Sequence, residues 1–219
     1  MRVKVCGMRD MENIVALSQV PIDFIGFIFY PLSPRFAAAN KKLEKWLAKE
    51  SPQALKSIAR VGVFVNSELE DVLNKVHDYE LDYIQLHGSE RPEYCMELFS
   101  LWSFSSIRRA AIIKAFSVDA NFDFETVKAY EPYCKYFLFD TKGASFGGNG
   151  EQFDWSLLEK YQGEVPFFLS GGIAEESAEA IKRLKHPMLA GVDVNSKFET
   201  APGLKDIASI QRFIQVLNQ

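Results

Sequence analysis

Apolar positions recur along this chain in runs that turn residues separate at nearly regular intervals. Eight runs have the length of buried strands, at residues 2–6, 23–29, 57–65, 81–86, 110–116, 135–140, 165–169 and 188–194. The spacing of apolar positions predicts helices at residues 10–19, 41–49, 68–77, 91–102, 121–131, 154–161 and 174–185, and a last one at about 203–217. Strand and helix periodicities therefore alternate throughout the chain.

This alternation predicts an α/β fold with a parallel sheet, because parallel neighbours need helical crossovers. Eight repeats in 219 residues match a minimal (β/α)8 TIM barrel. A flavodoxin-like open sheet, which normally needs fewer strands, is the alternative. Because no Ser/Gly/Pro-rich linker or shift in composition divides the chain, we expect a single domain spanning residues 1–219. Such a barrel can stand alone or dimerise through apolar helix faces, so we expect a monomer or homodimer.

Composition removes several classes of function. A net charge of −4 and a pI near 5.5 give no basic field, so we expect no nucleic-acid partner. No segment approaches the roughly 18 apolar residues needed to cross a bilayer, so we expect no membrane association. The cysteines at positions 6, 95 and 134 have no metal-ligand spacing and form no even-numbered framework. We therefore expect reduced thiols, no bound metal and a cytoplasmic location.

Two strand ends place reactive side chains at one mouth of the predicted barrel. Cys6 closes the first strand just before Gly7, and alternation puts it on the inward face with Lys4. Asp140 closes the sixth strand among phenylalanines, where burial would raise its pKa toward that of a general acid. By the same alternation Asp193 faces the mouth from the eighth strand. The competing interpretations are a cysteine that only fills the core and an aspartate that only ends a strand.

Glycine-rich turns after later strands suggest an anion site. Ser170-Gly171-Gly172 follows the seventh strand and Asn195-Ser196 the eighth, where barrel enzymes recurrently bind phosphate. The segment 143–150, with four glycines including Gly148 and Gly150, suits a mobile active-site loop but is weak as a phosphate motif. Ordinary tight turns would explain all three segments equally well.

Arg35 and His87 also follow predicted strands. Two prolines, Pro31 and Pro34, would stiffen the loop that carries Arg35, whose guanidinium suits carboxylate recognition. A solvated surface arginine is the alternative. His87 could be a base, a substrate contact or a satisfied structural histidine, and we favour the last two.

Several signatures are missing from the sequence: GxGxxG after a strand, Walker A, HExxH and a nucleophile elbow. The sequence therefore argues against nucleotide-dependent, zinc-protease and serine-hydrolase chemistry. It remains compatible with cofactor-free chemistry on a phosphorylated small molecule, in which a thiol and a carboxyl group would suit paired proton transfers.

Motifs that match a known family occur along nearly the whole chain: Lys4-Val-Cys-Gly-Met, Gly26-Phe-Ile-Phe-Tyr-Pro-Leu-Ser-Pro-Arg35, Val61-Gly-Val-Phe-Val-Asn66, Gln85-Leu-His-Gly88, Asp140-Thr-Lys, Gly147-Gly-Asn-Gly, Phe153-Asp-Trp155, Leu169-Ser-Gly-Gly172 and Gly191-Val-Asp-Val194. In these motifs the chain resembles the phosphoribosylanthranilate isomerases of tryptophan biosynthesis nearly from end to end. The order of these motifs and their placement at strand ends make the set specific.

This resemblance implies an Amadori rearrangement that needs no metal or organic cofactor. Asp140 would be the general acid and Cys6 the base. The pKa of Cys6 would lie near that of a free thiol and be lowered by a nearby cation. Lys4 could be that cation or could pair with Asp193. Arg35 would bind the anthranilate carboxylate. The resemblance also gives substrate contacts to His87 and Asp193, and phosphate contacts to Gly148, Gly150, Gly171, Gly172, Asn195 and Ser196.

Two positions depart from the family's usual pattern. Lys197 stands where glycine is common, which puts close backbone approach in doubt, although its ammonium could offset phosphate charge. Asn149 replaces a common threonine. Indole-glycerol-phosphate synthase, ribulose-phosphate epimerase and a noncatalytic phosphosugar-binding barrel are the alternatives. The synthase needs a lysine acid with glutamate partners at strand ends, and the epimerase needs metal-ligating histidines. This sequence shows neither set.

Overall fold

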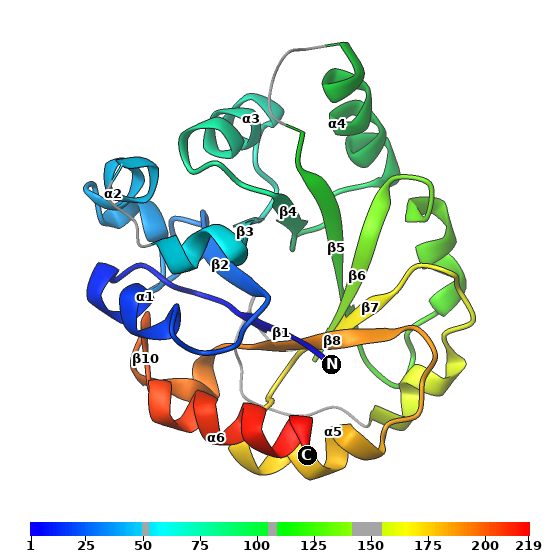
Figure 1. The fold of residues 1–219 in the computed structure, drawn as a ribbon. Coiled ribbons are helices and arrows are strands. Elements are labelled where there is room, and N and C mark those ends of the chain that lie inside the picture. Colours follow the sequence, from blue (N-terminus) through cyan, green and yellow to red (C-terminus); the bar gives the residue numbers. More distant parts are fainter. Residues whose placement is uncertain (50–52, 105–108, 142–154) are drawn as a thin grey trace.

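Eight parallel strands close into a barrel in the order in which they occur in the chain, which confirms the predicted (β/α)8 fold (Figure 1). The computed structural model describes residues 1–49, 53–104, 109–141 and 155–219. The strands are β1 Arg2–Val5, β2 Phe24–Ile28, β3 Ala59–Phe64, β4 Tyr83–Leu86, β5 Ala111–Val118, β6 Cys134–Thr141, β7 Phe167–Leu169 and β8 Leu189–Val194. Each overlaps one of the eight predicted apolar runs.

The barrel interior is a packed core below its carboxyl-terminal mouth. One cluster of inward-facing side chains fills it: Phe24, Val61, Ile113, Ala115, Tyr136, Leu138 and Phe168. Phe168 meets the rings of Phe24 and Tyr136 edge to face at 5.3 and 5.2 Å. Because this apolar plug fills the interior, polar chemistry is confined to the strand ends.

Helices surround the barrel and bury their apolar stripes against its outer face (Figure 1). The α-helices are α1 Met11–Leu17, α2 Leu43–Lys49, α3 Leu69–Asp78, α4 Pro92–Phe104, α5 Ala178–Arg183 and α6 Ile207–Asn218. Short 3₁₀ helices are η1 Ala37–Ala39, η2 Gln53–Ser57, η3 Phe124–Tyr130, η4 Trp155–Lys160, η5 Glu175–Ser177 and η6 Ser196–Phe198. Within the described part of the chain, no helix has the length and apolar content of a membrane span.

The helical predictions for 121–131 and 154–161 were wrong in type. The first is the 3₁₀ helix η3, which ends at Tyr130. The described part of the second is η4, again 3₁₀.

The last predicted helix begins later than expected, because a hairpin precedes it. Strands β9 Glu199–Ala201 and β10 Leu204–Lys205 pair antiparallel around Gly203, whose φ of +82° favours glycine. Helix α6 then starts after Asp206, whose carboxylate accepts from the amide of Ser209 at 3.1 Å. The hairpin was not predicted.

Candidate active site

A cavity of about 600 Å³ opens at the carboxyl ends of the strands. Nine predicted site residues line it together: Cys6, Arg35, His87, Asp140, Gly171, Gly172, Asp193, Asn195 and Ser196. The remaining two, Gly148 and Gly150, lie outside the described residues, as does the rest of segment 143–150. Strand ends far apart in the sequence thus contribute to one site.

A backbone hydrogen bond and a tight steric fit position Cys6 at the mouth. Its amide donates to the carbonyl of Val194 at 2.9 Å, which continues the β1–β8 pairing beyond the strand end. A Cβ at Gly26 would lie 2.8 Å from the Cys6 Sγ, so only glycine on the neighbouring strand leaves room for the thiol. The next residue, Gly7, has a φ of +79° and turns the chain away from the mouth.

Lys4 forms a buried ion pair with Asp193 and also lowers the pKa of Cys6, so it fills both of its expected roles. Its Nζ lies 2.8 Å from Asp193 Oδ1, and the two residues are partners in the β1–β8 register. Burial alone would lower the pKa of Lys4, but Asp193 and Cys6 raise it above its usual value. Burial raises the pKa of Asp193 against the opposing effect of Lys4.

Nearby cations do lower the pKa of the Cys6 thiol, but the expectation that its net pKa shift is downward was wrong for the free enzyme. Burial raises the pKa of Cys6, and the attraction of Lys4 and Lys205 only partly offsets that effect. The physical reason is the burial of the thiol, and the charge of Asp193 further opposes a thiolate.

His87 links Asp140 to the fourth strand. Its Nε2 lies 3.3 Å from Asp140 Oδ2, and its Nδ1 lies 2.7 Å from the amide nitrogen of Gln85. The ring of His87 therefore bridges the carboxyl group of Asp140 and the side chain of Gln85. Gln85 is a site residue that the sequence analysis missed, although its place two residues before His87 put it on the same face.

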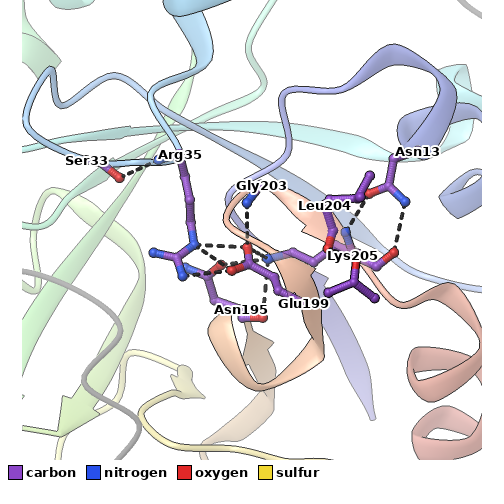
Figure 2. Close-up of polar contacts among 9 residues, drawn as sticks. Asn13, Ser33, Arg35, Asn195, Glu199, Gly203, Leu204 and Lys205 are labelled. Carbon is purple, nitrogen blue, oxygen red and sulfur yellow. Dashed lines mark hydrogen bonds and ion pairs between the residues drawn. The ribbon is translucent and has the colours of Figure 1, made fainter.

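Arg35 lies at the mouth, where its partner is an unpredicted residue, Glu199. The Arg35 Nε lies 2.9 and 3.0 Å from the two Glu199 carboxylate oxygens, and Nη2 lies 2.7 Å from Oε2 (Figure 2). Glu199 also accepts from Lys205 Nζ at 2.6 Å. Nothing in the local pattern marked Glu199 or Lys205, because both lie in the unpredicted hairpin.

The glycine-rich turn after β7 borders the cavity. Gly171 and Gly172 have φ values of +89° and +63°, and both line it. Asn195 and Ser196 line it from the turn after β8, and the exposed Lys197 side chain also borders the cavity. Consecutive left-handed glycines present amides that can hold an anion. Helix formation after Ala174 starts with the short 3₁₀ helix η5 rather than α5.

Neither of the other histidines nor the other two cysteines borders the cavity. His77 is exposed, whereas His186 is half buried and accepts from the amide of Met188 at 3.1 Å. All three cysteines are free thiols. Among the described residues, no group of three or more His, Cys, Asp or Glu side chains could hold a metal ion.

Comparison with known proteins identifies one family. A family model described as N-(5'phosphoribosyl)anthranilate (PRA) isomerase matches residues 3–216. The N-(5'-phosphoribosyl)anthranilate isomerase of Parabacteroides distasonis is 47% identical over 215 residues, covering 98% of this chain and 92% of the relative.

Solved structures agree with the sequence matches. The phosphoribosyl anthranilate isomerase of Thermotoga maritima superposes with a TM-score of 0.82 at 33% identity, covering 100% of this chain and 98% of the other. A phosphoribosyl anthranilate isomerase in complex with reduced 1-(o-carboxyphenylamino)-1-deoxyribulose 5-phosphate gives a TM-score of 0.79 at 31% identity, with the same coverage. This chain therefore belongs to the N-(5'-phosphoribosyl)anthranilate isomerase family.

Proposed function

We propose that Cys6 and Asp140 divide the proton transfers of the N-(5'-phosphoribosyl)anthranilate isomerase reaction, which the chain carries out in tryptophan biosynthesis. The reaction is an Amadori rearrangement of an aminoaldose to the aminoketose 1-(2-carboxyphenylamino)-1-deoxyribulose 5-phosphate. One observation carries the assignment: an acid and a thiol lie at the ends of β6 and β1 around one cavity.

Asp140 acts first, as a general acid. It protonates the furanose ring oxygen, and cleavage of the bond from that oxygen to the anomeric carbon leaves an iminium at the substrate nitrogen. The His87 Nε2–H, 3.3 Å from the carboxyl group, stabilises the carboxylate that remains after the transfer. The Gln85 side chain contacts the other ring nitrogen of His87 and orients the ring.

Cys6 then removes the C2' proton as thiolate. The adjacent iminium acidifies that proton, and the resulting enolamine tautomerises to the ketone. Burial keeps the pKa of Cys6 high in the free enzyme. A cationic iminium beside the sulfur lowers the pKa of Cys6, and loss of the thiol proton to solvent leaves the thiolate that acts as the base.

The other cavity residues hold the substrate. Arg35 binds the ring carboxylate, and the amides of Gly171 and Gly172 bind the phosphate. Asn195 and Ser196 complete the phosphate site, to which Lys197 adds positive charge and Gly148 and Gly150 add backbone contacts. Asp193 contacts the sugar while it neutralises Lys4. A cytoplasmic location, expected from reduced cysteines, is part of the proposal.

The assay is the loss of fluorescence of freshly generated phosphoribosylanthranilate. Wild type should be active, and Cys6→Ser and Asp140→Asn should each lose about 100- to 10,000-fold in rate, the usual contribution of a positioned acid or base. Both variants should keep the wild-type circular dichroism and still bind a reduced product analogue. Cys134→Ser, a cysteine outside the cavity, is the matched control and should keep its rate.

An inactive wild type with intact folding would favour the noncatalytic phosphosugar-binding alternative. Full rates in both variants would remove Cys6 and Asp140 from the chemistry while leaving the family assignment intact.

A further inference from the structure

A buried carboxylate lies between two cations at the rim of the cavity. Glu199 receives Nε and Nη2 of Arg35 on one side and Nζ of Lys205 on the other (Figure 2). The side chains of Glu199, Lys205 and Arg35 are 5%, 0% and 14% exposed. Charge-assisted contacts at this depth are strong and poorly screened, so they fix the geometry of all three groups.

The hairpin β9–β10 holds Glu199 in place from several directions. The Gly203 amide donates to Glu199 Oε1 at 3.1 Å. Asn13, on α1, accepts from the Lys205 amide at 2.7 Å and donates to the Lys205 carbonyl at 2.9 Å. The carboxylate is therefore anchored by the scaffold, independently of anything bound in the cavity.

The same cluster reaches the turn after β8. Lys205 Nζ lies 2.7 Å from Asn195 Oδ1 and 3.2 Å from the Asn195 carbonyl oxygen. Arg35 Cδ and Asn195 Oδ1 each lie 2.8 Å from where a Gly7 Cβ would be, so both pack over the turn that follows Cys6. One cluster thus touches the turn at the thiol and the turn at the proposed phosphate site.

Two cations and one carboxylate leave the cluster with one net positive charge. Glu199 occupies the edge of the guanidinium formed by Nε and Nη2, so Nη1 remains for another acceptor. Arg35 and Lys205 together lower the pKa of Glu199 against the effect of burial, so it stays ionised near neutral pH. The arrangement is suited to one further anion at the free edge of Arg35.

We propose that Glu199 is a positioning residue that aims the free edge of the Arg35 guanidinium at the aromatic carboxylate of the substrate. Lys205 supports it by neutralising Glu199 and tying it to Asn195. This inference rests on the proposed function, in which Arg35 binds that carboxylate. It predicts that losing the Glu199 charge weakens recognition of the carboxylate, even though removing an anion beside Arg35 would by itself favour anion binding.

Two ligands separate these effects: a reduced product analogue and the same molecule without its ring carboxylate. Calorimetry on Glu199→Gln should show about tenfold weaker binding of the first, since a misdirected guanidinium loses its charge-assisted contacts. Binding of the second should stay within about twofold of wild type. In the fluorescence assay KM should rise about tenfold while kcat falls by less than about threefold, because the interaction contributes equally to ground and transition states.

Two further variants guard against a general loss of folding. Glu199→Asp keeps the charge on a shorter side chain, so it should show the same preference with a smaller loss, and it serves alone if Glu199→Gln does not fold. Glu80→Gln is the matched control, because Glu80 pairs with Arg60 near the amino end of β3, away from the cavity. It should bind both ligands as wild type does.

Arg35→Gln distinguishes failure of this inference from failure of the proposed function. If Arg35→Gln binds both ligands as wild type does, Arg35 does not recognise the carboxylate and that part of the proposed function is wrong. If Arg35→Gln loses the carboxylated ligand selectively but Glu199→Gln and Glu199→Asp do not, only the positioning role is wrong. Equal losses of affinity for both ligands in Glu199→Gln, or tighter binding of the carboxylated ligand by that variant, would also contradict the positioning role of Glu199.

Discussion

At the residue scale, the Cys6 thiol shows how burial and charge compete at one atom. Two lysines favour its thiolate, but Asp193 opposes them and burial has the largest effect. The thiol is therefore neutral in the resting enzyme, which protects it from oxidation because the thiolate is the reactive form. Its basicity becomes useful only beside the cationic intermediate of the proposed mechanism.

The raised pKa of Cys6 has a measurable consequence. The thiolate absorbance of wild type minus that of Cys6→Ser should titrate with a midpoint above about 8.5, the ordinary thiol value. The folded pKa lies above the unfolded one, so the stabilisation is complete below the unfolded pKa and is lost as pH rises toward the folded value. Urea unfolding should therefore show wild type losing stability relative to Cys6→Ser above about pH 8.5. A midpoint below pH 8 would contradict this account.

At the element scale, the hairpin β9–β10 does more than connect β8 to α6. It carries Glu199 and Lys205, and it is attached to α1 through both backbone groups of Lys205. The strands contain only three and two residues, so their own pairing is too weak to hold this shape. The side chain of Asn13 supplies the missing hydrogen bonds.

Replacing Asn13 tests that role of the hairpin. Asn13→Ala leaves a buried amide and a buried carbonyl of Lys205 without partners, so we expect a loss of about 2–3 kcal/mol in unfolding free energy by urea titration. KM should also rise, because Glu199 is less firmly held. Asn40→Ala removes a bond to the Arg9 carbonyl and an exposed bond from the Lys42 amide; it is the control, with an expected loss of about 1 kcal/mol because neither partner is left fully buried. Equal losses in the two variants would mean that the hairpin does not depend on Asn13.

At the scale of the whole molecule, barrel closure depends on the seam between the first and last strands. Lys4 and Asp193 face each other across that seam in the barrel interior, just below the mouth. Their ion pair lies above the aromatic plug and contributes to the field at Cys6. A buried pair of this kind is costly to break, because the remaining charge has no partner.

Lys4→Met should therefore destabilise the enzyme by about 3–5 kcal/mol in urea unfolding. The double variant Lys4→Met/Asp193→Leu should lose less than Lys4→Met alone, since it leaves no unpaired charge in the interior. Lys128→Met removes an exposed lysine paired with Glu125 and should leave the unfolding free energy nearly unchanged. A double variant that is less stable than both single variants would show that the pair is needed for closure itself.

The sequence by itself determined the barrel and the faces of its strands. Alternation and strand ends placed Cys6, Asp140 and Asp193 at one mouth, because side-chain direction along a strand is a local property. The same local reasoning placed the turns that carry Gly171 and Asn195. Helix type was less predictable, because segments as short as η3 and η4 show too little of the 3.0- or 3.6-residue period to tell a 3₁₀ helix from an α-helix.

Only the tertiary structure decided how these residues are paired. Arg35 and Glu199 are 164 positions apart, and they meet because the closed barrel brings the ends of β2 and β8 to the same mouth. The direction of the Cys6 pKa shift was decided in the same way, since it depends on how deeply the thiol is buried and on the pairing of Lys4 with Asp193. Local patterns record which way a side chain points, whereas burial and ion pairing depend on every element packed around it.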